Sequence, residues 1–184
     1  SYIANASGNE TYKFTKVSFD RETHTESTLP AIHDESGKDK YNLFASSNLD
    51  IKDEKGNDTY NINDSKNIII TDEAGNDKYN LIENEDEFFH VVDVNIPDNG
   101  GKDTYTITGT EDDRAGYGEI TDSGKSKDTY KFTYCYGGNY WENVVDDGGK
   151  DSYTIANSYG IWIGDKGSDA DKYTVTQSEG SLYD

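Results

Sequence analysis

The stretch Asp53-Glu-Lys-Gly-Asn-Asp-Thr-Tyr-Asn-Ile62 decides the fold, because the chain repeats it. It recurs as Asp72-Glu-Ala-Gly-Asn-Asp-Lys-Tyr-Asn-Leu81 and is preceded by Asp34-Glu-Ser-Gly-Lys-Asp-Lys-Tyr-Asn-Leu43, so three copies follow one another at intervals of 19 residues. The segments Asp98 to Ile107 and Asp146 to Ile155 carry the same pattern. A fixed period of about 20 residues is the signature of a repeat architecture.

The common form of the repeat is D-x-x-G-x-D-x-Y-x-Φ, where Φ is apolar. Two looser copies, Asp122 to Phe132 and Asp165 to Val175, have stretched turns, and an incomplete copy, Ser7 to Phe14, opens the chain. Eight of the 15 tyrosines occupy the same motif position, at spacings of 19 to 29 residues. They are Tyr12, Tyr41, Tyr60, Tyr79, Tyr105, Tyr130, Tyr153 and Tyr173.

Each period contains two short extended segments. After the motif, Tyr60 and Ile62 alternate at a spacing of two, and before it Leu49, Ile51 and Asp53 do the same, which places each set on one face of a strand. We therefore predict an all-β, right-handed parallel β-solenoid resembling a β-roll, with about eight coils of two short strands and little or no helix. An antiparallel β-sandwich is the alternative, but it does not explain why the same turn returns in every period.

Composition and charge narrow the function. Only 32% of the 184 residues are apolar and the net charge is −20, yet the chain carries 15 Tyr, 6 Phe and 2 Trp. Such self-repulsion opposes a compact state, so we expect a divalent cation to offset it. The acidic surface argues against a nucleic-acid partner, the longest apolar run of Ile68 to Ile70 argues against membrane insertion, and Cys135 has no partner for an internal disulfide.

The repeated turn has the composition of a calcium site. It places two carboxylates five residues apart around a glycine, and Ca²⁺ takes six to eight oxygen ligands. Stacking would let one ion draw oxygens from two successive turns; the alternative is that these residues only cap turns. The candidate ligands are Asp34, Gly37, Asp39, Asp53, Gly56, Asp58, Asp72, Gly75, Asp77, Asp98, Gly101, Asp103, Asp122, Asp128, Asp146, Gly149, Asp151, Asp165 and Asp171.

The motif resembles the repeats-in-toxin (RTX) family, or hemolysin-type calcium-binding repeats, with nonapeptide G-G-x-G-x-D-x-U-x. Segments Gly56 to Tyr60 and Gly75 to Tyr79 match its G-x-D-x-U portion. The resemblance covers residues 5–176 and implies several Ca²⁺ ions in a parallel β-roll. The chain departs from the family in lacking most leading Gly-Gly pairs, in carrying one motif per coil, and in placing Lys38, Lys102 and Lys150 inside the turn, where each points to solvent or replaces an ion.

No catalytic constellation emerges from the sequence. The histidines His24, His33 and His90 are far apart in the repeat scheme, and Cys135 has no candidate base beside it, so we expect no enzymatic activity in this chain. The aromatic stretch Tyr134 to Trp141, with Tyr159 and Trp162, is either an exposed patch for carbohydrate or protein, or cover for a wide coil.

We expect residues 1–184 to form a single solenoid domain that is a fragment of a larger protein, with residues 15–30 as an insertion or capping loop. The RTX resemblance implies a secreted or bacterial cell-surface module that folds on binding calcium and supports the secretion, stability or presentation of neighbouring domains. The alternatives are a stalk or adhesin solenoid in which calcium is optional, or the non-catalytic module of a carbohydrate-modifying enzyme.

Overall fold

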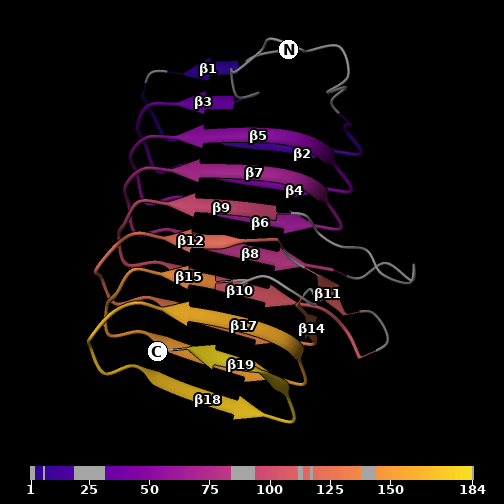
Figure 1. The fold of residues 1–184 in the computed structure, drawn as a ribbon. Helices are drawn as coiled ribbons and strands as arrows, with labels where there is room; N and C mark the ends of the chain where they lie inside the picture. The colour runs from indigo at the N-terminus through magenta and orange to yellow at the C-terminus, as the bar shows by residue number, and fades with distance from the viewer. Residues whose placement is uncertain are drawn as a thin grey trace, which may run out of the picture.

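The computed structural model describes residues 3–5, 7–18, 32–83, 94–111, 114–116, 118–137 and 144–183. All regular structure in these segments is β-strand, arranged in two sheets that face each other and between which the chain alternates (Figure 1). The paired strands run parallel throughout the described segments. The prediction of an all-β parallel β-solenoid is confirmed, and the antiparallel sandwich is wrong.

One sheet has eight strands in the order β18-β16-β13-β10-β8-β6-β4-β2. Each strand follows the repeated turn and carries the motif tyrosine at its second position, so tyrosine pairs with tyrosine across the sheet. The strands are β2 (Thr11–Thr15), β4 (Lys40–Phe44), β6 (Thr59–Asn63), β8 (Lys78–Ile82), β10 (Thr104–Thr108), β13 (Thr129–Thr133), β16 (Ser152–Ala156) and β18 (Lys172–Thr176).

The facing sheet has eleven strands, seven of which end at the first aspartate of a motif. Where β5, β7 and β17 are continuous, two other coils split the same path into β11 and β12 or into β14 and β15. The strands are β1 (Ile3–Asn5), β3 (Ile32–Asp34), β5 (Ser47–Asp53), β7 (Lys66–Asp72), β9 (Val94–Asp98), β11 (Ala115–Gly116), β12 (Ile120–Asp122), β14 (Cys135–Tyr136), β15 (Val144–Asp146), β17 (Tyr159–Asp165) and β19 (Glu179–Tyr183).

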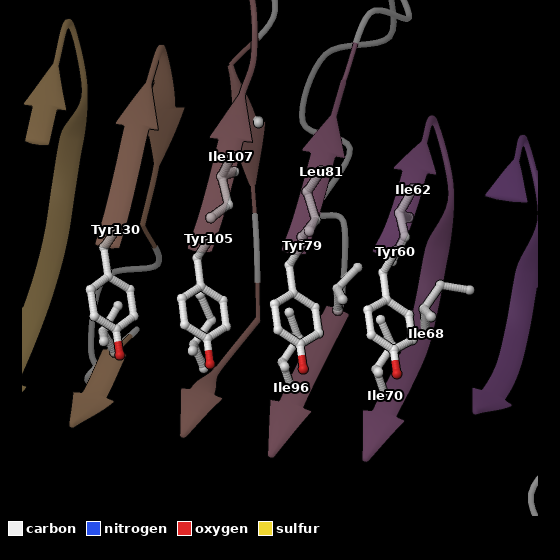
Figure 2. Packing of buried hydrophobic residues seen from close by; sticks show 14 of the residues in the cluster. Tyr60, Ile62, Ile68, Ile70, Tyr79, Leu81, Ile96, Tyr105, Ile107 and Tyr130 are labelled. Carbon is white, nitrogen blue, oxygen red and sulfur yellow. The ribbon is translucent and has the colours of Figure 1, made fainter. Parts of the chain in front are cut away.

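The core is a thin layer between the two sheets, organised by the column of motif tyrosines. Successive rings from Tyr12 to Tyr173 stack with centroids 4.8–4.9 Å apart and planes within 10°. This distance is the spacing of hydrogen-bonded strands, so identical side chains in register must stack. Figure 2 shows four of these rings with their hydroxyls pointing the same way, toward the edge where the first aspartates lie. Mostly Ile and Leu side chains, with a few of Val, Phe, Ala and Cys, fill the rest of the layer.

The two edges of the solenoid differ. The edge formed by the motif is lined with aspartate; the opposite edge turns at short polar segments in which a serine follows a residue of positive φ, such as Ala45, Asp64 or Asn157. We call these the aspartate edge and the serine edge. Among the described residues there is no helix long and apolar enough to cross a membrane.

Of the predicted insertion at residues 15–30, only residues 15–18 are described; Thr15 ends β2, and Ser18 forms an isolated parallel bridge with Ser47. Residues 19–30 lie outside the described segments.

Candidate metal centre

The aspartate edge carries two parallel ladders of carboxylates. The first ladder is formed by the first aspartate of each motif, which ends a strand of the eleven-stranded sheet and lies in register with its equivalent in the next coil. It consists of Asp34, Asp53, Asp72, Asp98, Asp122, Asp146 and Asp165. The second ladder is formed by the second aspartate and consists of Asp39, Asp58, Asp77, Asp103, Asp128, Asp151 and Asp171, preceded by Glu10.

The first-ladder carboxylates are hydrogen-bonded on both sides. In Asp53, Oδ2 accepts a hydrogen bond of 2.7 Å from the hydroxyl of Tyr41, and Oδ1 accepts one of 3.3 Å from the backbone N–H of Lys55. The strand alternation that buries Leu49 and Ile51 also turns Asp53 inward, which explains why its carboxylate reaches the tyrosine column. The first ladder therefore caps the turns and anchors the core.

Asp72 is the exception in the first ladder. Its Oδ2 accepts a 2.8 Å hydrogen bond from the hydroxyl of Tyr60, but its Oδ1 is buried without a hydrogen-bond partner in the described segments. Burial, and after it the like charge of Asp98 on the neighbouring coil, raises the pKa of Asp72 to about 7.

The second ladder is bonded on one side only. The backbone N–H of Asp58 donates to Oδ1 of Asp77 over 2.6 Å, and the N–H of Asp77 donates to Oδ1 of Asp103 over 2.6 Å. The remaining oxygen, Oδ2, is buried and has no hydrogen-bond partner within the part of the chain that the structure describes. This holds for Asp39, Asp58, Asp77, Asp103, Asp128, Asp151 and Asp171, and for Oε2 of Glu10.

The glycine of the motif is required by the crowding of oxygens around it. A Cβ added to Gly56 would lie 2.3 Å from Oδ2 of Asp58 and 2.5 Å from the carbonyl oxygen of Gly37 in the preceding coil. Gly75 is in the same position between Asp77 and Gly56. At Gly56 and Gly75 the absence of a side chain lets the carboxylate and the neighbouring carbonyl approach this closely.

Carboxylates from two coils converge at each step of the ladders. Asp39, Asp53 and Asp58 offer ligand oxygens that all lie within 4.8 Å of one another, and the same grouping recurs along the edge. These groups include Glu10, Asp34 and Asp39; Asp58, Asp72 and Asp77; Asp77, Asp98 and Asp103; and Asp103, Asp122 and Asp128. An all-oxygen donor set drawn from aspartates is the chemistry that hard divalent cations prefer.

Burial of these carboxylates makes ionisation costly. The pKa of Asp58 rises to about 7, that of Asp103 to about 8 and that of Asp77 to about 9, in each case first because burial removes water from the charged form. Neighbouring aspartates add to the shift, led by Asp72 at Asp77 and by Asp98 at Asp103. A positive ion beside the carboxylates would remove both costs.

The structure brings every predicted aspartate and glycine to this edge, including those of the stretched copies. Asp128 and Asp171 reach the second ladder, where their Oδ1 atoms accept hydrogen bonds from Asp103 and Asp151. The lysines Lys38, Lys102 and Lys150 are exposed, which favours the alternative in which they point to solvent.

Glu10 was not among the predicted ligands. The incomplete first copy pairs Tyr12 with Tyr41, and that register places Glu10 where other copies carry their second aspartate. Its backbone N–H donates to Oδ1 of Asp39, as an aspartate would do there. Counting back two residues from the motif tyrosine was the signal that could have found it.

Other reactive residues lie away from this edge. His33 pairs through Nε2 with Oε1 of Glu54 at 2.8 Å on the outer surface of the eleven-stranded sheet. Cys135 is fully buried, and burial raises the pKa of its thiol to about 12, which keeps it unreactive. His24 and His90 lie outside the described residues.

No protein-family model, curated protein or solved structure matches the chain. The membership of the RTX family therefore stays a prediction.

Proposed function

We propose that the chain is a calcium-binding solenoid module of the RTX type, which folds as calcium binds along the aspartate edge. The observation that carries this proposal is the column of buried second-ladder Oδ2 atoms with no hydrogen-bond partner in the described segments. A buried polar atom without a partner is costly, and a buried anionic one more so. Repetition of that cost in every coil favours a ligand that satisfies all of them.

Different residues at the aspartate edge would have different roles in binding the ion. Oδ2 of a second-ladder aspartate such as Asp58 would be the anchoring ligand, with Asp77 of the next coil and the first-ladder Asp72 beside it. The backbone N–H to Oδ1 bonds hold each carboxylate in place, and the glycines keep the space open. Calcium supplies the positive charge that this edge lacks, and the binding free energy then contributes to folding.

The number of coils and the handedness of the solenoid are part of the same proposal. We infer eight coils, one for each motif tyrosine, which agrees with the eight strands of the tyrosine-bearing sheet. We also infer a right-handed winding, because crossovers between parallel strands in one sheet are right-handed in about 98% of cases.

The cellular role follows from the dependence on calcium. A chain of charge −20 would stay expanded where calcium is scarce and fold where it is abundant, which suits a secreted or cell-surface bacterial module. It would support or present neighbouring domains without catalysis of its own. In the alternative, a stalk or adhesin solenoid, the same coils form without calcium.

Circular dichroism with thermal melts, in EDTA and across a calcium titration, tests the proposal. We expect a coil-like spectrum in EDTA that becomes β-rich with calcium and less so with equal magnesium, since Mg²⁺ demands a more rigid octahedral site. Terbium(III), a luminescent substitute for Ca²⁺, should show tyrosine-sensitised emission, because the tyrosine hydroxyls contact the first ladder. An unchanged β-rich spectrum and melting temperature in EDTA would reject coupled folding and favour the stalk.

A further inference from the structure

A polar hollow lies at the serine edge, away from both aspartate ladders. Its volume is about 470 Å³, within the range of about 300–1,000 Å³ that holds small ligands. Its lining comes from the residue before β11, the end of β14, and the starts of β17 and β19 with the residues just before them, so it spans four successive coils. The residues that matter here are Arg114, Tyr136, Ser158, Tyr159, Gln177 and Glu179.

Two aromatic rings form one side of the hollow. Tyr136 and Tyr159 pair in register between β14 and β17, and their rings stack with centroids 5.9 Å apart and planes within 8°. Tyr159 is 47% exposed, whereas the six central motif tyrosines from Tyr41 to Tyr153 are fully buried. Tyr136 is half-buried beside it, so the pair forms a partly exposed aromatic shelf and is not part of the core.

A β-bulge presents the shelf. The register of β17 and β19 shifts between Tyr159 and Ile161, and Gly160 between them has a φ of +65°. A Cβ on Gly160 would lie 2.8 Å from the carbonyl oxygen of Gly137. Both this close contact and the positive φ therefore favour glycine at the position. Bulges of this kind re-aim side chains beside functional sites.

Polar groups of complementary kinds surround the shelf. Arg114 is held by a 2.7 Å hydrogen bond from Nη1 to the carbonyl oxygen of Asn157, and within the described segments this engages one donor of its guanidinium fork. Gln177 offers both a donor and an acceptor, and Glu179 offers acceptors, all on the wall of the same hollow. An aromatic face ringed by both donors and acceptors suits a ligand with an apolar ring face and many hydroxyls.

We propose that this hollow binds a neutral carbohydrate, with a sugar ring stacked on the Tyr136–Tyr159 shelf and its hydroxyls bonded to Arg114, Gln177 and Glu179. Neutral sugars are favoured because Glu179 and the net charge of −20 repel a polyanionic glycan. A concave hollow of this volume favours a short glycan segment over the broad contact surface of a protein partner. Of the aromatic stretch Tyr134 to Trp141, residues 138–141 lie outside the described segments, and the proposal does not use them.

Affinity electrophoresis in native gels with calcium tests the proposal. The gels contain xylan, laminarin or dextran as neutral polymers, and alginate as the polyanion. We expect at least one neutral polymer to retard the parent protein, and Tyr159→Ala to weaken that retardation at least about tenfold, the scale of one lost anchoring contact. Phe44→Ala is the matched control, because Phe44 is an exposed aromatic of 41% on the other sheet, and it should bind as the parent does.

Retardation by no neutral polymer, by alginate alone, or equally for Tyr159→Ala and the parent would overturn the proposal. If Tyr159→Ala loses the parent's β-rich spectrum, the exposed Gln177→Ala takes its place under the same criteria. The result is separable from the calcium proposal, since the hollow and the aspartate ladders lie on opposite edges. Retardation that persists in EDTA would reject coupled folding alone.

Discussion

At both edges of the solenoid a side-chain oxygen accepts a hydrogen bond from a backbone N–H of the neighbouring coil, but the side chains differ. On the serine edge, the backbone N–H of Ser46 donates to Oγ of Ser65 in the next coil over 3.0 Å, and that hydroxyl donates to the carbonyl oxygen of Asn63 over 2.8 Å. On the aspartate edge, the N–H of Asp58 donates to Oδ1 of Asp77 over 2.6 Å, and Oδ2 is left over. The serine hydroxyl both accepts and donates a hydrogen bond, whereas Oδ2 of the aspartate has no hydrogen-bond partner in the described segments.

The difference shows that the fold alone does not need the charge. A neutral oxygen two bonds from the backbone is enough to join coils, as Ser158 shows by accepting from the N–H of Cys135 and donating to the carbonyl of Ala156. Stacking carboxylates at the spacing of β-strands adds repulsion that the serine edge avoids. The cation binding that we propose for the aspartates would explain why the edge carries them.

Removing negative charge from the aspartate edge, which makes it more like the serine edge, should have the largest effect on folding and calcium binding. The triple variant Asp58→Asn, Asp77→Asn and Asp103→Asn keeps an oxygen that can accept the inter-coil hydrogen bond and removes three negative charges. We expect it to be more β-rich than the parent in EDTA and to respond to calcium with a transition at least about tenfold weaker in affinity. Circular dichroism across a calcium titration measures both changes.

The matched control for the triple variant is Ser46→Ala with Ser65→Ala, which removes acceptors from the serine edge. It should lower the melting temperature at saturating calcium, and excess calcium should not restore it, because the proposed ions bind at the opposite edge. A triple variant that needs as much calcium as the parent would show that the second ladder is not the metal site.

The pH dependence of the calcium-free protein separates the edges further, since serine does not titrate. The pKa values of Asp58, Asp103 and Asp77 rise on folding to about 7, 8 and 9, above the value of about 3.9 for an unfolded chain. The folded state then holds more protons, so this contribution is fully present below about pH 4 and is lost as pH rises through about 7 to 9. Each carboxyl contributes at most about 1.4 kcal/mol per pH unit.

Circular dichroism in EDTA between about pH 4 and pH 9 measures this dependence: β-structure should be most populated at the acid end, where the carboxyls are protonated, and should give way to coil as pH rises. With saturating calcium the dependence should flatten or reverse, because protons and calcium compete for the same oxygens. Stability in EDTA that increases with pH would contradict the raised pKa values.

Placing one charge on the serine edge should lower the free energy of unfolding by less than raising the pH does, because the pH change ionises several carboxylates. In Ser65→Asp, Oδ1 still reaches the N–H of Ser46, but the second oxygen enters a buried position that no carboxylate ladder lines. We expect a loss of about 2–3 kcal/mol in the free energy of unfolding, and no recovery on adding calcium, since one carboxylate does not make a site. Ser65→Asn is the uncharged control. Full rescue by calcium would mean that stacked ladders are unnecessary for binding.

The sequence predicted the aspartate edge well, because the motif fixes it through a rigid period. Residues that alternate at a spacing of two, such as Leu49, Ile51 and Asp53, predicted the strands. The constant period then predicted the parallel solenoid, the tyrosine column and the stacking of the turns. The unequal roles of the two aspartates could not be predicted. Composition shows two carboxylates per turn, and only the spatial positions reveal that Tyr41 saturates one oxygen of Asp53.

The serine edge was less predictable, since its turns share little sequence. Ser46, Ser65 and Ser158 are followed or preceded by different residues, and their common hydrogen bonds depend on a positive φ one residue earlier, at Ala45 or Asn157. The aromatic shelf likewise depends on a bulge at Gly160. Such features arise from the alignment of coils that are 19 to 29 residues apart, which local propensity does not encode.

The smallest expected effect is a difference in stability between two variants that each remove a tyrosine hydroxyl from the first ladder, one at Asp98 and one at Asp72. Tyr79→Phe removes a 2.8 Å hydrogen bond to Oδ2 of Asp98, which still accepts from the hydroxyl of Tyr105 over 3.0 Å, so we expect a loss of about 1 kcal/mol. Tyr60→Phe removes the hydroxyl that donates to Oδ2 of Asp72, a residue whose Oδ1 has no partner in the described segments, so the loss should reach about 2 kcal/mol.

Urea unfolding of both variants at saturating calcium measures the difference of about 1 kcal/mol, and each keeps the ring that stacks in the column. The two substitutions are matched in burial, since Tyr60 and Tyr79 are both fully buried and stack on each other at 4.9 Å. If Tyr79→Phe proves as costly as Tyr60→Phe, the second hydroxyl at Asp98 does not compensate. The aspartates of the first ladder would then depend on one tyrosine each.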